Sequence, residues 1–155
     1  MPHIVIRLSG PVDTTLARRA VEAVADLTVD ILGKAREVIA TEVGFVADDQ
    51  WYIAGRSLAE WQRSAFQLDI SVTDETNTKT EKARYLAAIH AAFRGLRPDL
   101  HEICYVHIID ARAAAYGSRK VRADRRGSPL PGRRSIRSRL PRQRAMPSQV
   151  RPPGT

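Results

Sequence analysis

Hydrophobic and polar positions follow the same order twice along the chain: a short strand, an amphipathic helix and a second strand. A first strand is predicted over residues 3–8, which are rich in β-branched side chains and end at a Ser-Gly-Pro break. Apolar residues then recur at three- and four-residue steps, which predicts a helix that begins near Asp13 or Thr14 and ends at Gly33. Residues 37–46 alternate in the manner of a second strand. The first unit therefore has the order strand, helix, strand.

The same order returns after a short extended piece at residues 51–55, which we expect to be a hairpin edge. A strand is predicted over 65–73, a turn over 74–77, a helix over 78–96 and a last strand over 102–109. The apolar positions of this second helix are Ala83, Leu86, Ala87, Ile89, His90 and Phe93. Aligning Pro2 with Ala65 superimposes the two units, which indicates an internal duplication.

The predicted fold class is α+β. Right-handed crossovers in both units place the two helices on one face of a four-stranded mixed sheet. The domain is expected to span residues 1–117, with duplicated β-α-β units at 2–55 and 65–117. Its strands read as apolar on both faces, so the sheet face away from the helices needs a second surface to cover it. Self-association is the simplest source of that surface.

Charge divides the chain into two parts. The whole sequence carries 25 Lys and Arg against 17 Asp and Glu, a net charge of +8. Residues 118–155 hold 12 of these basic side chains and one acid, so residues 1–117 have a net charge of −3. The predicted domain therefore lacks the excess of cations that a nucleic-acid-binding face needs. The Arg- and Pro-rich tail at 118–155 has no apolar periodicity and is expected to be disordered, and any nucleic acid binding would depend on it alone.

Cysteine and histidine are too few for cross-links or for a metal site. One cysteine, Cys104, cannot form an internal disulfide, and the four histidines show no spacing typical of metal ligands. No stretch resembles a signal peptide or reaches the length of a membrane span. We therefore expect a cytoplasmic protein with no membrane association.

Pro2 is the residue that most suggests chemistry. Methionine before a small second residue is normally removed, which would leave the secondary amine of Pro2 at the start of a buried strand. An N-terminal amine titrates at about 8, and desolvation or a neighbouring cation lowers its pKa. In an apolar pocket Pro2 would be neutral at pH 7 and able to act as a general base. A different environment would make it a cationic acid.

Several segments together resemble the tautomerase superfamily. They are the opening MPHIVI, the sequence ATEV at 40–43, WYIAG at 51–55 and AYG at 115–117. The duplication resembles the longer members of that superfamily, which fuse two 4-oxalocrotonate-tautomerase-like units and include relatives of cis-3-chloroacrylic acid dehalogenase and malonate semialdehyde decarboxylase. The resemblance covers residues 2–117 and implies a homotrimer in which neighbouring subunits complete a pocket around Pro2. It also implies a reaction without metal or organic cofactors.

The resemblance also indicates which side chains would bind a small carboxylate substrate. The 4-oxalocrotonate tautomerases place one arginine in the turn after the first strand and another at the start of the second strand. Here the first position lacks an arginine, and the second is Glu37 with Arg36 one residue earlier, so Arg36 is the candidate carboxylate-binding residue. Trp51 would form a wall of the pocket and also suits a packing or interface position. Tyr105 would orient a substrate oxygen, with core or sheet-face packing as the alternative role.

The activities within the superfamily differ in the residues that they require. The hydrolytic dehalogenases use a histidine late in the first helix, two arginines after the third strand and a glutamate before the Tyr-Gly pair. This chain has Thr28, Asp74, Asn77 and Ala115 at those places. The sequence therefore favours a keto-enol tautomerase in which Pro2 is the general base for a 2-hydroxydienoate or enolpyruvate-type substrate. The alternatives are a dehalogenase or decarboxylase with a cationic Pro2, and a non-catalytic oligomeric binding protein.

Overall fold

The computed structural model describes residues 2–117. Its elements follow one another as β1 (His3–Ser9), α1 (Thr14–Leu32), η1 (Arg36–Val38), β2 (Ala40–Val46), β3 (Tyr52–Ile53), β4 (Arg56–Ser57), α2 (Leu58–Trp61), β5 (Phe66–Thr73), α3 (Lys79–Leu96) and β6 (Tyr105–Ala111). The basic tail at 118–155 lies outside the described residues, so its expected disorder and the domain boundary at 117 stay predictions.

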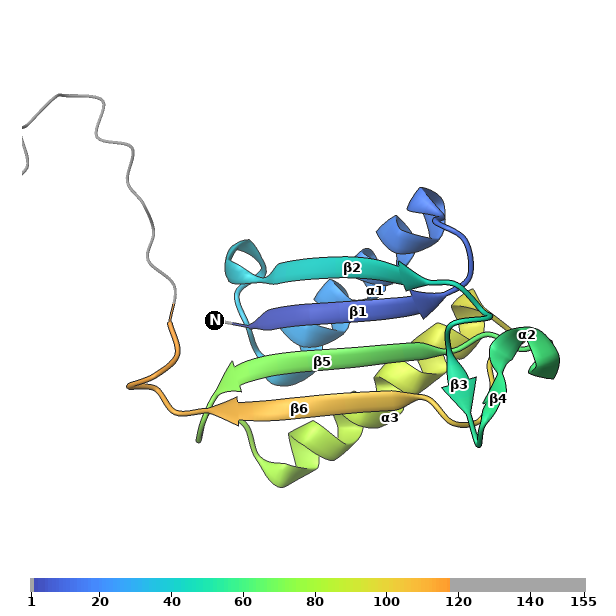
Figure 1. Cartoon of the computed structure of the whole chain (residues 1–155). Helices are drawn as coiled ribbons and strands as arrows, with labels where there is room; N and C mark the ends of the chain where they lie inside the picture. The colour runs from blue at the N-terminus through green and yellow to red at the C-terminus, as the bar shows by residue number, and fades with distance from the viewer. Residues whose placement is uncertain (1, 118–155) are drawn as a thin grey trace, which may run out of the picture. The chain divides into compact units, whose positions relative to one another are not determined.

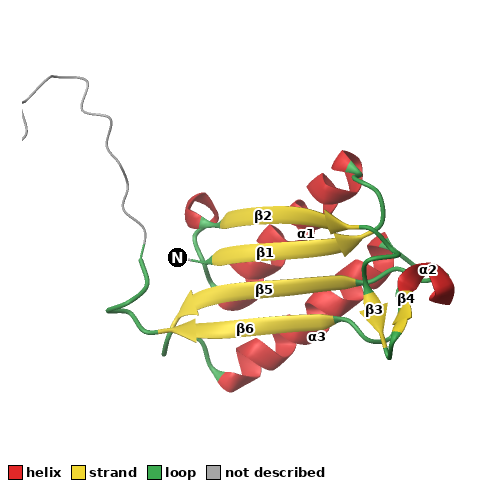
Figure 2. Cartoon of the chain, viewed as in Figure 1, coloured by secondary structure: helices red, strands yellow, loops and turns green. Residues whose placement is uncertain are grey.

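The four long strands form one sheet in the order β2-β1-β5-β6 (Figure 1). β1 is parallel to β2 and β5 is parallel to β6, while β1 and β5 pair antiparallel. The long helices α1 and α3 lie on one face of this sheet (Figure 2). The predicted α+β class, with a mixed sheet and both helices on one side, is therefore confirmed.

The two ends of the sheet carry different features. β1 and β2 begin where β5 and β6 end, and we call this the proline end because Pro2 precedes β1 there (Figure 1). The β3–β4 hairpin lies at the opposite end, which we call the hairpin end. α1 runs from the hairpin end to the proline end, and α3 runs in the reverse direction.

Alternate side chains of the central strands form the core. The fully buried residues of β1 and β5 include Ile4, Ile6, Leu8, Leu68, Ile70 and Val72. Equivalent positions of β1 and β5 in the two units are therefore separated by an even number of residues, as Ile4 and Leu68 are. The predicted alignment of Pro2 with Ala65 has an odd offset and is wrong by one residue, because a slip of one residue would turn the buried side chains to the other face.

Local capping determines where α1 begins and ends. The Asp13 carboxylate accepts hydrogen bonds from the backbone N–H groups of Thr15 and Leu16, both at 2.9 Å. The helix ends at Gly33, whose φ of 63° is left-handed and favours glycine. Both predicted limits of this helix are confirmed.

The buried stripe of α3 differs from the prediction. Tyr85 and Ile89 are fully buried, whereas Ala83 and Ala87 are exposed. The hydroxyl of Tyr85 lies 3.0 Å from the hydroxyl of Thr28 on α1, which in turn donates to the Val24 carbonyl at 2.7 Å. A satisfied hydrogen bond allows a tyrosine to enter the core, so the larger aromatic side chain is buried in preference to the alanines.

Two predicted strands begin later than expected. Residues 36–38 form a short 3-10 turn, in which the Ile39 N–H donates to the Arg36 carbonyl at 3.1 Å, so β2 begins at Ala40 and not at 37. β6 begins at Tyr105 and not at 102, because residues 101–104 form a loop that the His101 N–H ties to the Ser64 carbonyl at 2.7 Å. Neither turn has a hydrophobic signature that distinguishes it from a strand.

The predicted extended piece at 51–55 is part of a two-stranded hairpin, β3 paired with β4. The short helix α2 follows it and was not predicted. Ser57 caps α2, because its hydroxyl accepts from the Glu60 N–H at 3.3 Å and the Glu60 carboxylate accepts from the Ser57 N–H at 2.8 Å. The capping box therefore begins a helix that is too short to show hydrophobic periodicity.

The sheet face away from the helices is polar at its centre. Asp69 on β5 accepts hydrogen bonds from Arg7 at 3.4 Å and from Gln67 at 3.1 Å. His107 on β6 lies 3.6 Å from the same carboxylate. The expectation of strands that are apolar on both faces is therefore wrong, because charged side chains alternate with the buried apolar ones.

Candidate functional site

Pro2 is buried at the start of a central strand. It directly precedes β1, which lies between β2 and β5 (Figure 1). Its carbonyl oxygen accepts a hydrogen bond from the Ala40 N–H at 3.2 Å, at the start of β2. The structure therefore places Pro2 where the sequence predicts, next to the first residues of two paired strands.

Tyr116 also reaches the proline end. The chain turns after β6, where the Ala115 N–H donates to the Arg112 carbonyl at 2.8 Å. The hydroxyl of Tyr116 then donates to the Ser71 carbonyl of β5 at 3.1 Å, and Ser71 is the register partner of His3. Burial raises the pKa of Tyr116, and a hydrogen bond from the backbone of His3 opposes that rise. Tyr116 thus contacts the pair of strands one residue from Pro2.

Arg36 lies at the proline end as well, in the η1 turn before β2. Its side chain is exposed and forms an ion pair with Asp26 on α1. Lys34, two residues earlier, donates to the Thr76 hydroxyl at 2.9 Å. Burial lowers the pKa of Lys34, and the charge of Glu81 opposes that shift. Of the predicted site residues, Arg36 is the one that shares this end of the sheet with Pro2.

Trp51 and Tyr105 lie at the hairpin end. Trp51 follows β2 and is half-buried, and its carbonyl accepts from the Leu58 N–H at 2.9 Å. Tyr105 is the first residue of β6 and is 69% exposed, on the sheet face away from the helices. The seven-residue strands span about 20 Å. One copy of the chain therefore does not bring Trp51 or Tyr105 next to Pro2.

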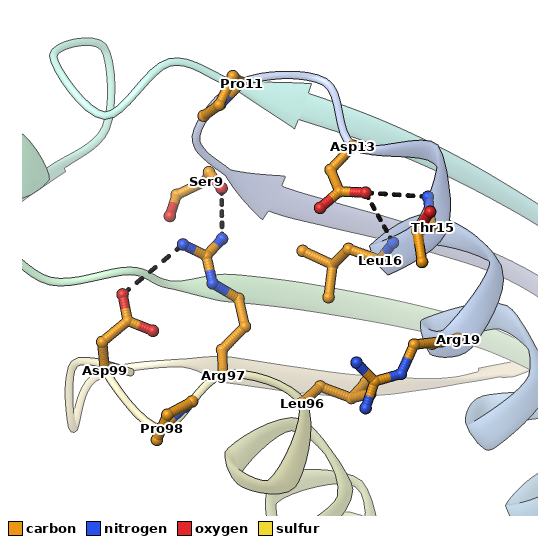
Figure 3. A pocket seen from close by; sticks show the side chains of 10 residues that line it. All are labelled: Ser9, Pro11, Asp13, Thr15, Leu16, Arg19, Leu96, Arg97, Pro98 and Asp99. Carbon is orange, nitrogen blue, oxygen red and sulfur yellow. Dashed lines mark hydrogen bonds and ion pairs between the residues drawn. The ribbon is translucent and has the colours of Figure 1, made fainter.

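A pocket of about 340 Å³ opens at the hairpin end, between the first turn of α1 and the end of α3 (Figure 3). Arg97 donates to the Ser9 carbonyl at 2.6 Å and lies 3.7 Å from the Asp99 carboxylate. Arg19 of α1 also lines the pocket, as does the capping residue Asp13. The lining therefore combines two guanidinium groups with two carboxylates.

The sequence interpretation assigned no role to Arg97 or Tyr116. It noted that the turn after β1 lacks an arginine, yet the guanidinium of Arg97 lies against that turn, 88 residues further along the chain. Tyr116 entered only through the AYG segment of the resemblance. Both contacts depend on tertiary structure, so no local spacing indicates them.

Residues 2–117 contain neither a metal-binding cluster nor a membrane-spanning helix. That part of the chain has no group of three or more His, Cys, Asp or Glu side chains placed to hold a metal ion. None of its helices is long and apolar enough to cross a membrane. The half-buried Cys104 packs against the core, and burial raises the pKa of its thiol.

No family model and no curated protein sequence matches the chain. Solved structures do match it. Pt0534 inactivated by 2-oxo-3-pentynoate is 13% identical, with a TM-score of 0.66, over 75% of this chain and 90% of that one. A fused 4-OT described as a symmetric trimer is also 13% identical, with a TM-score of 0.65, over 76% and 93%.

A macrophage migration inhibitory factor-like protein from Entamoeba histolytica is 14% identical, with a TM-score of 0.62, over 76% of this chain and 95% of that one. The chain has the tautomerase fold. The likeness to a fused 4-OT fits the duplicated tautomerase units that the sequence predicts. At these identities the comparison establishes the fold, and the activity has to be argued from the residues.

Proposed function

We propose that this chain is a cofactor-independent keto-enol tautomerase in which the amine of Pro2 is the general base. One observation carries the proposal: Pro2, the second residue of the chain, is buried at the start of a central strand of a tautomerase fold. Removal of Met1 would turn its nitrogen into a secondary amine. The substrate would be a small 2-hydroxydienoate or enolpyruvate-type carboxylate.

Burial gives Pro2 the protonation state that this reaction needs. Desolvation disfavours the charged form of an amine and so lowers its pKa from about 8. The neutral nitrogen would take the proton of the enol hydroxyl, and the same proton would then be delivered to carbon. An O–H bond breaks, a C–H bond forms and the enol becomes a ketone, so the reaction needs no redox partner.

We propose that the complete site forms between copies of the chain, in a homotrimer. Trp51 and Tyr105 lie about 20 Å along the strands from Pro2 of the same copy, so only a neighbouring copy could supply them. Trp51 would then form a wall of the pocket and Tyr105 would orient a substrate oxygen. The trimer described for a fused 4-OT supports this assembly.

Arg36 is the proposed carboxylate-binding residue. Its partner Asp26 is exposed, with a side chain 58% accessible. An exposed ion pair contributes only about 0–1 kcal/mol, so a substrate carboxylate could replace Asp26 at little cost. The guanidinium would offer two parallel N–H donors to that carboxylate.

The test compares wild type with Pro2→Ala, after mass spectrometry has established that Met1 is absent from both. We expect kcat/KM for a 2-hydroxydienoate to fall by about 10²–10⁴-fold, the usual contribution of a general base. 2-Oxo-3-pentynoate, which inactivates Pt0534, should inactivate wild type and add its mass to the N-terminal peptide. Circular dichroism and sedimentation verify that the variant keeps its fold and its assembly.

Full activity in folded Pro2→Ala, or a wild-type chain that retains Met1, would refute the proposal. A chain extended by one residue before Pro2 is a matched control, because it keeps the proline ring and converts the amine into an amide. Its loss of activity should equal that of Pro2→Ala. A pKa of the Pro2 amine above 8 would favour the dehalogenase or decarboxylase alternative, in which Pro2 is a cationic acid.

A further inference from the structure

We infer that Tyr116 is a positioning residue for Pro2, because its hydroxyl holds the ends of β1 and β5 together one residue from the proline. The inference rests on the proposed function, in which the Pro2 amine reacts. Tyr116 would not contact the substrate itself. It would act by holding the Pro2 amine in position.

The turn after β6 brings Tyr116 back over the sheet. The Asp74 N–H donates to the Ala111 carbonyl at 2.9 Å, which fixes the end of β6, and the Ala115 N–H closes the following turn onto Arg112 at 2.8 Å. Tyr116 comes directly after this turn, and its ring is partly buried. Its hydroxyl therefore approaches the sheet from a turn that directly follows a fixed strand end.

The contact falls on the last residue pair of the β1–β5 ladder. The Tyr116 hydroxyl donates to the Ser71 carbonyl at 3.1 Å, and Ser71 pairs with His3. Pro2 precedes His3, and its carbonyl accepts from the Ala40 N–H, so its backbone faces β2 and adds no hydrogen bond to β5. Within residues 2–117 no other side chain is described as hydrogen-bonded to the backbone of this pair. Tyr116 thus adds a side-chain hydrogen bond at the end of this ladder, next to Pro2.

Loss of the hydroxyl would loosen this end of β1. The Ser71 carbonyl would lose its hydroxyl donor, and a partly buried carbonyl that loses a hydrogen bond draws in water. Water next to Pro2 would stabilise the protonated amine and move its pKa back towards about 8. Less neutral amine would be present at pH 7, so turnover would fall while substrate binding would change little.

The test is Tyr116→Phe, with Tyr52→Phe as the matched control. Tyr52 is 62% exposed on the hairpin, at the other end of the sheet. The pKa of the Pro2 amine is measured by NMR titration of nitrogen-15 proline, together with kcat and KM. For Tyr116→Phe we expect the pKa to rise and kcat at pH 7 to fall about three- to tenfold, with KM within about twofold. Tyr52→Phe should match wild type.

An unchanged Pro2 pKa and an unchanged kcat in folded Tyr116→Phe would overturn the inference. A rise in KM alone would also overturn it, because that result would place Tyr116 in contact with substrate. The proposed function fails separately, through full activity of Pro2→Ala. If Pro2→Ala is inactive and Tyr116→Phe leaves the pKa of Pro2 unmoved, the proposed function stands and the role of Tyr116 does not.

Discussion

The two ends of the sheet differ in the contacts that join neighbouring elements. At the hairpin end, Phe66 of β5 stacks on Phe93 of α3, with ring centroids 4.0 Å apart, and His90 meets Phe66 edge-on at 5.5 Å. At the proline end, the hydroxyls of Thr28 and Tyr85 join the two helices at 3.0 Å. An aromatic stack therefore joins sheet and helix at one end, and a hydroxyl pair joins the helices at the other.

Further hydrogen bonds belong to the proline end. The Asn77 side chain donates to the Leu32 carbonyl at 3.0 Å, which ties the start of α3 to the end of α1. The Lys34 amine reaches the Thr76 hydroxyl at 2.9 Å. Apolar packing is non-directional, whereas a hydrogen bond fixes distance and angle. We therefore expect the aromatic stack to contribute more to stability, and the hydrogen bonds to fix the geometry around Pro2.

The largest expected effect lies at the hairpin end. Phe93→Ala removes a fully buried ring and its stack with Phe66, and we expect the free energy of unfolding to fall by about 3–5 kcal/mol. Urea denaturation at a fixed protein concentration measures this change. Val12→Ala is the control, because Val12 is 78% exposed and should change stability by less than about 0.5 kcal/mol. A loss below about 1 kcal/mol in Phe93→Ala would remove the distinction between the two ends.

The next largest effect is the pH dependence of the unfolding free energy that Tyr85 causes at the proline end. Burial raises the pKa of Tyr85 to about 12, whereas the unfolded chain loses this proton at about 10. The stabilisation that Tyr85 contributes is therefore complete below pH 10 and is lost as the pH rises to about 12. A difference of about two units corresponds to about 2–3 kcal/mol.

Tyr85→Phe isolates this contribution. We expect the unfolding free energy of wild type to fall more steeply between pH 9 and about 11.5 than that of the variant, as measured by urea denaturation. Below pH 9 the variant should lose about 1 kcal/mol, since Thr28 keeps its bond to the Val24 carbonyl. Tyr52→Phe, with an exposed ring, should keep the wild-type slope. Parallel slopes in wild type and Tyr85→Phe would contradict the prediction.

The fold could be predicted wherever a local signal determined the structure. The cap at Asp13 and the left-handed Gly33 both act within a few residues, and the predicted limits of α1 are confirmed. The burial of Tyr85 could not be predicted, because its hydrogen-bond partner Thr28 is 57 residues away. The odd offset between the units arose because the apolar residues at 65–73 do not show which face is buried until the strands pair.

The candidate site also combines residues that a local sequence signal indicates with residues that only the folded structure reveals. Pro2 could be proposed as a candidate from the sequence, because it follows the first methionine and precedes a predicted buried strand. Tyr116 and Arg97 could not, because each acts on backbone 45 and 88 residues away, respectively. The sequence analysis placed Trp51 and Tyr105 in one site with Pro2, whereas in one copy both lie at the hairpin end and Pro2 lies at the proline end. The proposed assembly between copies is therefore the part of the proposed site that local sequence signals do not indicate.

The smallest expected effect is the loss of stability when a helix cap is removed. The caps of α1 and α3 can be compared because the two helices begin at opposite ends of the sheet. Asp13 caps α1 at the hairpin end through two hydrogen bonds at 2.9 Å. Thr78 caps α3 at the proline end within a reciprocal box, in which the Glu81 carboxylate accepts from the Thr78 N–H at 2.7 Å. Asp13→Ala and Thr78→Ala should each lower the unfolding free energy by about 0.5–2 kcal/mol, measured by urea denaturation at pH 7.

We expect Asp13→Ala to lose more. It removes both acceptor contacts and a negative charge at the start of the helix, whereas Thr78→Ala leaves Glu81 bonded to the backbone. Backbone and hydroxyl hydrogen bonds from Thr78 lower the pKa of Glu81, so the box stabilises the fold above the ordinary glutamate pKa, and its contribution disappears as the pH falls through the lowered value. Thr78→Ala should therefore cost less at pH 3 than at pH 7. A larger loss from Thr78→Ala at pH 7 would show that the proline end also depends on its helix cap for stability, and the division of roles between the two ends would then fail.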